Sequence, residues 1–472
     1  MNGKALRFIK NMSYTISSNL ISLIVSTLVI LIVPKLIGVK EYGYWQLYLF
    51  YSSYVGFLHF GWNDGIYLRY GGFEYNKLDK KLFFSQFISL LSSQIVIGIF
   101  IWIITMFFVN EMNRAFILKM TVMTMVIENL RIMLLYILQI TNRIKEYARV
   151  TISDRIVYIL LIITFLIVGV RDYKFMIIAD LVGKLTSLVY SMILCKEIVF
   201  NRVSNFYFNV TETITNISSG IKLMFANIAS TLIIGIVKFG VERTWDVSTF
   251  GRVSLTLSIS NMMMIFINAV GIILFPILRR TSREKLSSIY SIMRDFLMVL
   301  SLGALTLYYP LKTIMVAWLP QYAESLLYMA LVFPMFIYEG KMAFLINTYL
   351  KTLRREKVML QINVITMLCS LFMTYIVTQI FNNLNIAILN IVILLAFRSV
   401  LAELYLSKEL NLNVKKDVFL ELLLTLIFIL SGWFINSWFT VLIYGMAYII
   451  YLTIKKKDIT KTIISLRLLM KA

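Results

Sequence analysis

The chain has 472 residues, of which 60% are hydrophobic and 15% are charged, and its mean hydropathy is +0.82. Soluble proteins are about 45–50% apolar and about 25% charged, and they must present polar surface to water. The composition therefore excludes a soluble enzyme, a nucleic-acid-binding domain and a disordered scaffold. It predicts an all-α polytopic membrane protein.

Fourteen apolar segments are long enough to cross a membrane, because a hydrocarbon core about 30 Å thick needs about 20 helical residues. In chain order they lie near residues 13–37, 44–66, 82–109, 115–140, 150–170, 174–195, 215–239, 249–277, 289–318, 323–349, 358–381, 384–406, 417–434 and 437–454. The longest polar connection, 196–215, follows the sixth segment. No connection is large enough to fold as a separate catalytic domain.

The basic residues predict how these segments are oriented. Of the 46 Lys and Arg residues, 29 lie in the two termini and in every second connection, 7 lie in the other connections, and 10 lie in or beside the segments. Cytoplasmic connections of membrane proteins are enriched in Lys and Arg. We therefore predict an even number of spans with both termini in the cytoplasm. Most of the net charge of +22 then reflects topology and not a nucleic-acid partner.

The two halves of the chain resemble each other at an offset of 208 residues. The offset pairs Asn19 with Asn227 and Ser22 with Ser230 without a gap. Each repeat holds six spans, so both copies have the same orientation and form two pseudo-symmetric six-helix bundles. The predicted parts are an N-terminal bundle, a C-terminal bundle, and an extra transmembrane hairpin with a basic tail, at residues 1–205, 206–410 and 411–472.

Basic residues in or beside the segments are candidates for binding an anionic substrate in a water-filled cleft. An ionised side chain at the bilayer centre costs about 2.5–3.5 kcal/mol, so such residues usually face a cavity or a partner. The candidates are Arg131, Lys184, Lys222, Arg252, Lys341 and Arg398. Arg155, Arg252, Arg294 and Lys312 lie near segment ends, where reaching toward the membrane surface also explains them.

Three carboxylates within the segments, Glu128, Asp180 and Glu339, are candidates for coupling transport to an ion, because a carboxylate in the membrane can take up and release a proton. Glu128 precedes Arg131 by three residues and Asp180 precedes Lys184 by four, so each pair shares one helix face. A structural ion pair explains each of these two pairs equally well.

The sequence offers little for metal or redox chemistry. His59 is the single histidine, and Cys195 and Cys369 lie in or beside apolar segments without a CxxC partner. We therefore expect no metal site, no disulfide and no cofactor.

Two stretches of the first half and one of the second carry a resemblance to a known family. They are Asn19 through Pro34 to Gly38-Val39-Lys40-Glu41-Tyr42-Gly43-Tyr44-Trp45, then Gly61-Trp62-Asn63-Asp64-Gly65-Ile66-Tyr67-Leu68-Arg69-Tyr70, and Phe275-Pro276-Ile277-Leu278-Arg279-Arg280. The chain resembles the Wzx-type O-antigen and polysaccharide-unit flippases of the multidrug/oligosaccharidyl-lipid/polysaccharide (MOP) exporter superfamily. Its length, its span count and its paired halves fit this family.

The resemblance implies a MATE-like inverted V of two six-helix bundles with a cationic central cavity. It implies a flippase that moves undecaprenyl-pyrophosphate-linked oligosaccharide from the cytoplasmic to the outer leaflet of the bacterial plasma membrane by alternating access. It further implies coupling to a proton or sodium gradient and a role in lipopolysaccharide or capsule synthesis. The expected partners are this lipid-linked substrate, membrane lipids, and the polymerase and chain-length machinery of polysaccharide synthesis, around a monomeric transporter.

Three other functions remain open at this point. A lipid II flippase of peptidoglycan synthesis also fits fourteen spans and a cationic cavity. A multidrug antiporter for organic cations would favour a net negative cavity, and a polytopic glycan polymerase usually carries a sizeable extramembrane loop.

Overall fold

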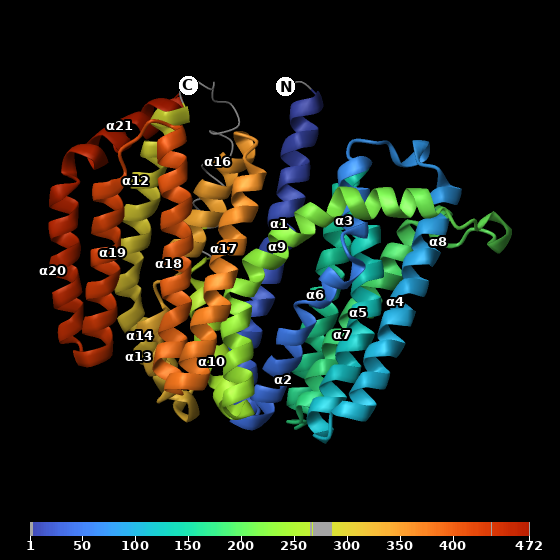
Figure 1. Cartoon of the computed structure of the whole chain (residues 1–472), viewed down its shortest axis with the longest axis horizontal. Helices are drawn as coiled ribbons and strands as arrows, with labels where there is room; N and C mark the ends of the chain where they lie inside the picture. Colours follow the sequence, from blue (N-terminus) through green and yellow to red (C-terminus); the bar gives the residue numbers. More distant parts are fainter. Residues whose placement is uncertain (1–2, 265–266, 268–285, 436, 472) are drawn as a thin grey trace. The chain divides into compact units, whose positions relative to one another are not determined.

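The computed structural model describes residues 3–264, 267, 286–435 and 437–471 (Figure 1). These residues form helices joined by short connections, and none of them lies in a β-strand. The predicted fold class, an all-α polytopic membrane protein, is confirmed. The end of the eighth predicted segment and the stretch Phe275–Arg280 lie outside the described residues.

Ten helices among the described residues are long and apolar enough to cross a membrane, and two further pairs of helices qualify if each bent pair is one span. The bent pairs are Ser325–Val332 with Met335–Thr352, and Phe439–Ile454 with Lys456–Ser465. The remaining two predicted segments correspond to the broken run from Val39 to Arg69 and to the helix that begins at Val247. The protein is thus a multi-pass membrane protein.

The chain divides into two compact units, Met1–Ile228 and Ala229–Ala472. The boundary lies inside one long helix, and the residues from 411 onward belong to the second unit. The division into two six-helix bundles and an extra hairpin, with boundaries after residues 205 and 410, stays a prediction.

The first unit contains nine α-helices or parts of them among its described residues. They are α1 (Gly3–Leu36), α2 (Val39–Ser52), α3 (Trp62–Arg69), α4 (Lys80–Phe108), α5 (Met112–Ile140), α6 (Ile144–Ile167), α7 (Tyr173–Leu194), α8 (Lys196–Val199) and the first half of α9 (Val210–Thr244). Asp79 and Asp172 cap α4 and α7, because their side chains accept hydrogen bonds from backbone N–H groups of the first helical turn.

Helix α5 is the central helix of the first unit. In its most apolar stretch 61% of the residues are buried, against 28% in α4 and in α6, and it packs against α2, α4 and α7. Leu134, Ile137 and Leu138 of α5 are completely buried in the core of this unit. Asn129 and Arg131 of α5 are likewise buried.

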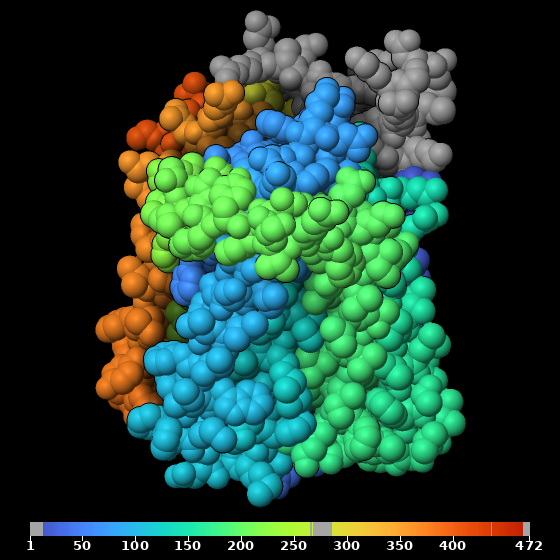
Figure 2. Space-filling view, turned by 90° about the vertical axis from the view of Figure 1, so that its right-hand side faces the viewer, coloured from blue at the N-terminus to red at the C-terminus, as the bar shows by residue number. Residues whose placement is uncertain are grey.

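The first half of α9 packs so closely against α3 that the two backbones are in contact. Gly61 and Gly65 form a G-x-x-x-G pair, and a Cβ at Gly65 would collide with the backbone of Asn216. Arg69 of α3 donates to Glu212 and Asn216 at 2.5 Å each. Figure 2 shows the green start of this segment lying beside the blue residues around α3.

The second unit contains the second half of α9 and eleven further described α-helices. They are α10 (Val247–Met262), α12 (Leu286–Ala304), α13 (Tyr308–Trp318), α14 (Met329–Val332), α15 (Met335–Gly340), α16 (Asn347–Thr352), α17 (Glu356–Tyr375), α18 (Leu384–Glu409), α19 (Lys415–Leu430), α20 (Phe439–Ile454) and α21 (Lys456–Lys471). The π-helical turns η8 (Lys341–Ile346), η9 (Ile376–Phe381) and η10 (Ser431–Ile435) continue α15, α17 and α19.

The span around Pro334 is broken, with a bend of 43°. Proline lacks the backbone N–H that a continuous helix needs, and the π-turn η8 follows shortly after it. In this irregular stretch Glu339 contacts Arg398, whereas Lys341 contacts Glu403 and Glu421.

The predicted repeat has a structural counterpart in the helix boundaries. Helices α1 and α9 end at Leu36 and Thr244, and α2 and α10 begin at Val39 and Val247. Both pairs of boundaries are 208 residues apart, which is the offset of the sequence repeat.

Candidate functional site

The charged residues of the first unit gather where α5, α6 and α7 pack together. We call Glu128, Arg131, Asp154, Asp180 and Lys184 the Asp180 cluster. Arg131 donates to both carboxylate oxygens of Glu128, at 3.0 and 2.7 Å, and its guanidinium lies 3.6 Å from Asp154 of α6. The spacing prediction that Glu128 and Arg131 share a face is confirmed, and the two side chains form a bidentate ion pair.

Asp180 connects α7 to the second span. Its carboxylate accepts a hydrogen bond from Lys184 and another from Tyr48 of α2 at 2.6 Å. The Tyr48 hydroxyl lies 2.8 Å from the hydroxyl of Thr124 on α5. The cluster thus ties four helices together.

The charges of the Asp180 cluster balance. Its three carboxylates face Arg131 and Lys184, and Arg155 lies 3.9 Å from Asp154. Within the described residues, the cluster offers no surplus positive charge to an anion while it stays in this arrangement.

A second cluster surrounds Arg398 of α18, and we call Arg398, Glu339, Asn363 and Ser230 the Arg398 cluster. The guanidinium donates to the Asn363 side chain at 2.9 Å and to the Ser230 hydroxyl at 2.7 Å. Its contact with Glu339 is longer, at 3.4 Å. Arg398 is buried, whereas the Glu339 side chain is 27% exposed.

This cluster therefore holds an arginine by two neutral hydrogen bonds and one loose ion pair. A neutral partner does not cancel charge, so the positive charge of Arg398 is only partly compensated. Ser230 is the residue that the sequence repeat pairs with Ser22. The repeat did not indicate that Ser230 belongs to a site.

A third cluster is completely enclosed, and we call Arg294, Lys341, Glu403 and Glu421 the hairpin cluster. Lys341 donates to Glu403 at 2.8 Å and to both oxygens of Glu421 at 2.7 Å. Arg294 of α12 donates to Glu403 at 2.5 Å and lies 3.5 Å from Glu421. All four side chains are at most 3% exposed.

The hairpin cluster attaches the last two spans to the rest of the second unit. Glu421 lies on α19, while its partners lie on α12, α18 and the π-turn η8. Two cations and two carboxylates match, so Lys341 contributes no surplus charge. The interpretation of Arg294 as a residue reaching toward the membrane surface is wrong, because buried carboxylates from two other helices surround it.

Lys455 lies between α20 and α21, at the edge of the hairpin cluster. Its amine lies 3.0 Å from Asp295, 2.9 Å from Asp417 and 2.8 Å from Asp458. Burial alone would lower the pKa of Lys455, but the hydrogen bonds to Asp458 and Asp417 raise it above its ordinary value. These contacts fix the bend of 69° between α20 and α21.

The remaining predicted site residues lie elsewhere. Lys222 is exposed on the first half of α9, and Arg252 is half-buried on α10. The sequence reasoning missed Asp154, Glu403 and Glu421. Asp154 and Glu403 are each the single carboxylate of their predicted segment, and Glu421 shares its segment with Asp417 alone. That rarity of carboxylates was the available signal.

No group of three or more His, Cys, Asp or Glu side chains in the described part of the chain is arranged to hold a metal ion. His59 is buried, and its Nδ1 accepts a hydrogen bond from the backbone N–H of Gly61 at 3.0 Å. Cys195 is a buried cysteine, and Cys369 is half-buried.

No known family model matches the chain, and no curated protein matches it in sequence. Solved structures match it in fold. The lipid II flippase MurJ in an inward closed conformation has a TM-score of 0.64 and 14% identity, with 96% of this chain and 100% of that chain covered. An inward-facing multidrug resistance MATE family transporter of the MOP superfamily has a TM-score of 0.60 and 11% identity, with 83% and 98% covered.

The chain has the MOP superfamily fold. The MOP fold that the sequence resemblance implied is therefore confirmed. Identities of 14% and 11% establish a common fold and leave the substrate to be inferred from the chain's own residues.

Proposed function

We propose that this MOP-fold protein is a flippase for undecaprenyl-pyrophosphate-linked oligosaccharide units. It moves them from the cytoplasmic to the outer leaflet of the bacterial plasma membrane by alternating access, for the synthesis of an O-antigen-type or capsule-type polysaccharide. The observation that carries the flippase part of the proposal is the likeness to the MurJ flippase over 96% of the chain. The stretches that resemble polysaccharide-unit flippases support the choice of substrate.

The Arg398 cluster suits the charged part of such a substrate. A guanidinium donates to two phosphate oxygens at once, and two of the three partners of Arg398 are neutral, so its charge is only partly compensated. Glu339 is its loosely bound counter-charge. A pyrophosphate group competes with Glu339 for Arg398, and the released carboxylate binds the coupling ion, a proton or sodium.

The Asp180 cluster has a different role in this proposal. Tyr48 and Lys184 hold Asp180 between α2 and α7, so a change in the charge of Asp180 would loosen the packing of these helices. Asp180 and Glu128 are thus candidates for ion coupling in the first unit. Arg131 and Lys184 contribute to substrate binding only when their carboxylates release them.

A lipid II flippase is the second candidate, and the same whole-length likeness to MurJ favours it. Lipid II also carries a pyrophosphate on a polyprenyl chain, so the Arg398 cluster does not separate the two substrates. A multidrug antiporter is disfavoured because its cationic substrates would meet Arg398 and not a free carboxylate.

Deletion of the gene in its native host separates these functions. The expected result is loss of a surface polysaccharide, with accumulation of complete lipid-linked units on the cytoplasmic face. Unchanged polysaccharide together with lethal arrest of peptidoglycan synthesis would instead assign lipid II.

A complementation series in the deletion strain tests the candidate site. We expect Arg131→Gln, Lys184→Gln, Lys222→Gln and Arg398→Gln each to lower transport at normal expression levels. Wild-type transport by all four variants would refute anion binding at these positions.

A further inference from the structure

Helix α21 follows α20, the last predicted span, at an angle of 69° (Figure 1). It packs against α12 on one side. Lys455 holds the bend, because its amine contacts both Asp417 of α19 and Asp458 of α21. No residue of α21 belongs to the Asp180, Arg398 or hairpin clusters. The open side of α21 is thus a surface of fixed position that these three clusters do not use.

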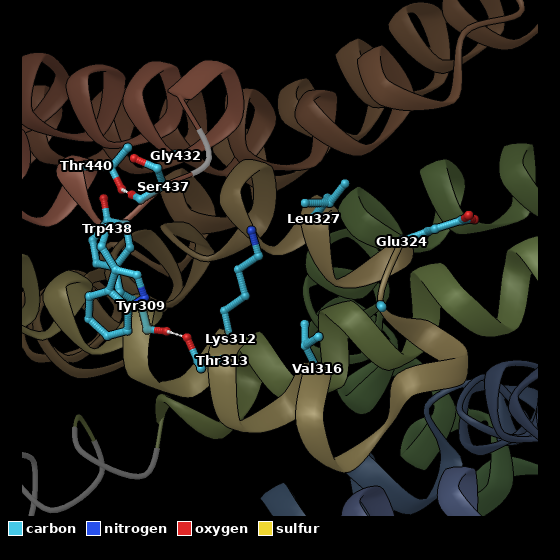
Figure 3. Close-up of a pocket in the computed structure, with 11 residues that line it drawn as sticks. Tyr309, Lys312, Thr313, Val316, Glu324, Leu327, Gly432, Ser437, Trp438 and Thr440 are labelled. Carbon is cyan, nitrogen blue, oxygen red and sulfur yellow. Dashed lines mark hydrogen bonds between the residues drawn. The ribbon is translucent and has the colours of Figure 1, made fainter.

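The length of α20 places α21 at a membrane surface. Trp438 directly precedes α20, beside a cavity that Ser437 and Thr440 also line (Figure 3). Trp438 is 62% exposed and Phe439 is 71% exposed, which is typical of the level where lipid head groups meet the hydrocarbon. The 16 residues of α20 then rise by about 24 Å, which is most of a hydrocarbon core about 30 Å thick. A helix that turns by 69° at this point follows the opposite membrane surface, which the basic residues predict to be the cytoplasmic one.

The helical positions of α21 separate a buried side from an exposed side. Thr462 is 4% exposed and marks the buried side. Successive helical residues are about 100° apart, and the exposed lysines and isoleucines all fall within an arc of about 160° opposite Thr462. These residues, which we call the basic face of α21, are Lys456, Lys457, Lys461, Ile463 and Ile464. Ile463 is 46% exposed and Ile464 is 54% exposed. The basic face thus combines three ammonium groups with two large apolar side chains.

The three lysines of the basic face keep their positive charge. Asp458, the carboxylate of α21, pairs with Lys455 at 2.8 Å. In the described part of the chain none of the three lysines forms an ion pair. Two neighbouring isoleucines gain nothing from contact with water, whereas an anionic lipid surface offers phosphates to the lysines and acyl carbons to the isoleucines. The charge and the apolar side chains of this face are therefore complementary to such a surface.

We propose that α21 is an interfacial helix whose basic face binds the anionic phospholipids of the adjacent leaflet. Its lysines contact head-group phosphates, and Ile463 and Ile464 enter the boundary between head groups and acyl chains. Each lysine at an anionic surface favours binding about fivefold. The interaction does not depend on which substrate the protein transports, because it uses no residue of the Arg398 cluster.

The full-length protein in lipid nanodiscs tests this surface. Thr460 is exposed in the middle of the basic face, so Thr460→Cys carries a fluorophore there, in a background with Cys195→Ser and Cys369→Ser. The nanodiscs consist of phosphatidylcholine and contain, at increasing fractions, a spin-labelled quencher lipid that is either phosphatidylglycerol or phosphatidylcholine. We expect half-quenching at about a tenth of the fraction for spin-labelled phosphatidylglycerol, because the lysines enrich it around the probe.

Two triple variants with the same change in net charge make the result specific. Replacement of the three lysines of the basic face by glutamine should abolish the preference for phosphatidylglycerol. The control removes three exposed lysines of other predicted cytoplasmic connections and should retain the preference. It consists of Lys351→Gln, Lys357→Gln and Lys408→Gln. The double variant Ile463→Ser with Ile464→Ser should weaken quenching by both lipids, since the helix then enters the boundary less deeply.

Three results would overturn the proposal. The first is equal quenching of the wild-type basic face by both lipids, which would remove the preference for anionic head groups. The second is an equal loss of preference in the two triple variants, which would make it a property of net charge and not of α21. The third is the absence of quenching by either lipid, which would place the face in water and favour a soluble acidic protein as its partner.

Discussion

The hairpin cluster and the Arg398 cluster lie in the same unit and use the same residue types, but their charges are paired to different degrees. In the hairpin cluster each cation contacts two carboxylates, and the Lys341 side chain has no exposed surface. In the Arg398 cluster one arginine has a single carboxylate at 3.4 Å, and that carboxylate is 27% exposed.

The difference shows that the depth of a charge in the membrane does not by itself mark a functional residue. Lys341 and Arg398 both lie in apolar segments without a carboxylate three or four residues away, and both are candidates by that criterion. Removing two ions from water costs several kcal/mol per ion, and only a fully paired cluster recovers this cost. Lys341 is therefore a structural residue in this arrangement, whereas Arg398 retains charge for a ligand.

The largest expected effect tests the structural side of this comparison. Lys341→Met leaves Glu403 and Glu421 with Arg294 alone, so two buried carboxylates face one cation of the cluster. Breaking a buried ion pair costs about 3–5 kcal/mol. We expect a strong decrease in the thermal unfolding temperature in detergent. The double variant Lys341→Met with Glu421→Met keeps the pair of Arg294 and Glu403 and should recover most of the loss. Wild-type stability of the single variant would contradict a structural role.

The second-largest loss of stability is expected at Lys455, at the edge of the hairpin cluster. Lys455→Gln leaves Asp295 and Asp417 with the more distant Arg294, at 4.0 and 3.7 Å, in place of the close Lys455 amine. The expected loss is about 1.5–3 kcal/mol. The folded pKa of Lys455 is raised, so its stabilising contribution is fully present below its unfolded pKa and is lost only above it. The difference in unfolding temperature between variant and wild type should thus be constant from about pH 6 to about pH 9. A difference that disappears within this range would contradict the assignment.

Arg398→Lys tests the functional side. A lysine cannot donate to Asn363, Ser230 and a phosphate in the fork geometry of arginine, so transport should fall about tenfold. Unfolding temperature should fall much less than in Lys341→Met. Glu339→Gln separates the two proposed roles of this carboxylate. If transport no longer depends on the ion gradient, Glu339 couples transport to the ion. If the variant binds its substrate more tightly, Glu339 competes with the substrate for Arg398. If Arg398→Lys lowers the unfolding temperature and transport to the same degree, the Arg398 cluster has a structural role, like the hairpin cluster.

The smallest effect is expected at the surface. Arg355 and Glu409 form an ion pair at 2.6 Å, with exposed fractions of 47% and 31%. Exposed pairs contribute little because water and salt screen them. Glu409→Gln should therefore change neither the unfolding temperature nor transport, and it serves as the control for every carboxylate variant above.

The sequence alone determined the features that depend on local composition. Hydropathy over about 20 residues is a local property, so the membrane class and the segments could be predicted, including broken ones such as the span around Pro334. The offset of 208 residues anticipated the helix boundaries at Leu36 and Thr244. The pairs Glu128–Arg131 and Asp180–Lys184 were predictable because three or four residues make one helix turn.

Only the tertiary structure decided which charges neutralise each other over long distances in sequence. Lys341 meets Glu403 and Glu421 at separations of 62 and 80 residues, and Arg398 meets Ser230 at a separation of 168. Spacing along one helix carries no information about which neighbouring helix packs against it. The packing of α12, α18 and α19 therefore decides that Lys341 is neutralised. The packing of α9, α15, α17 and α18 decides that Arg398 is only partly neutralised.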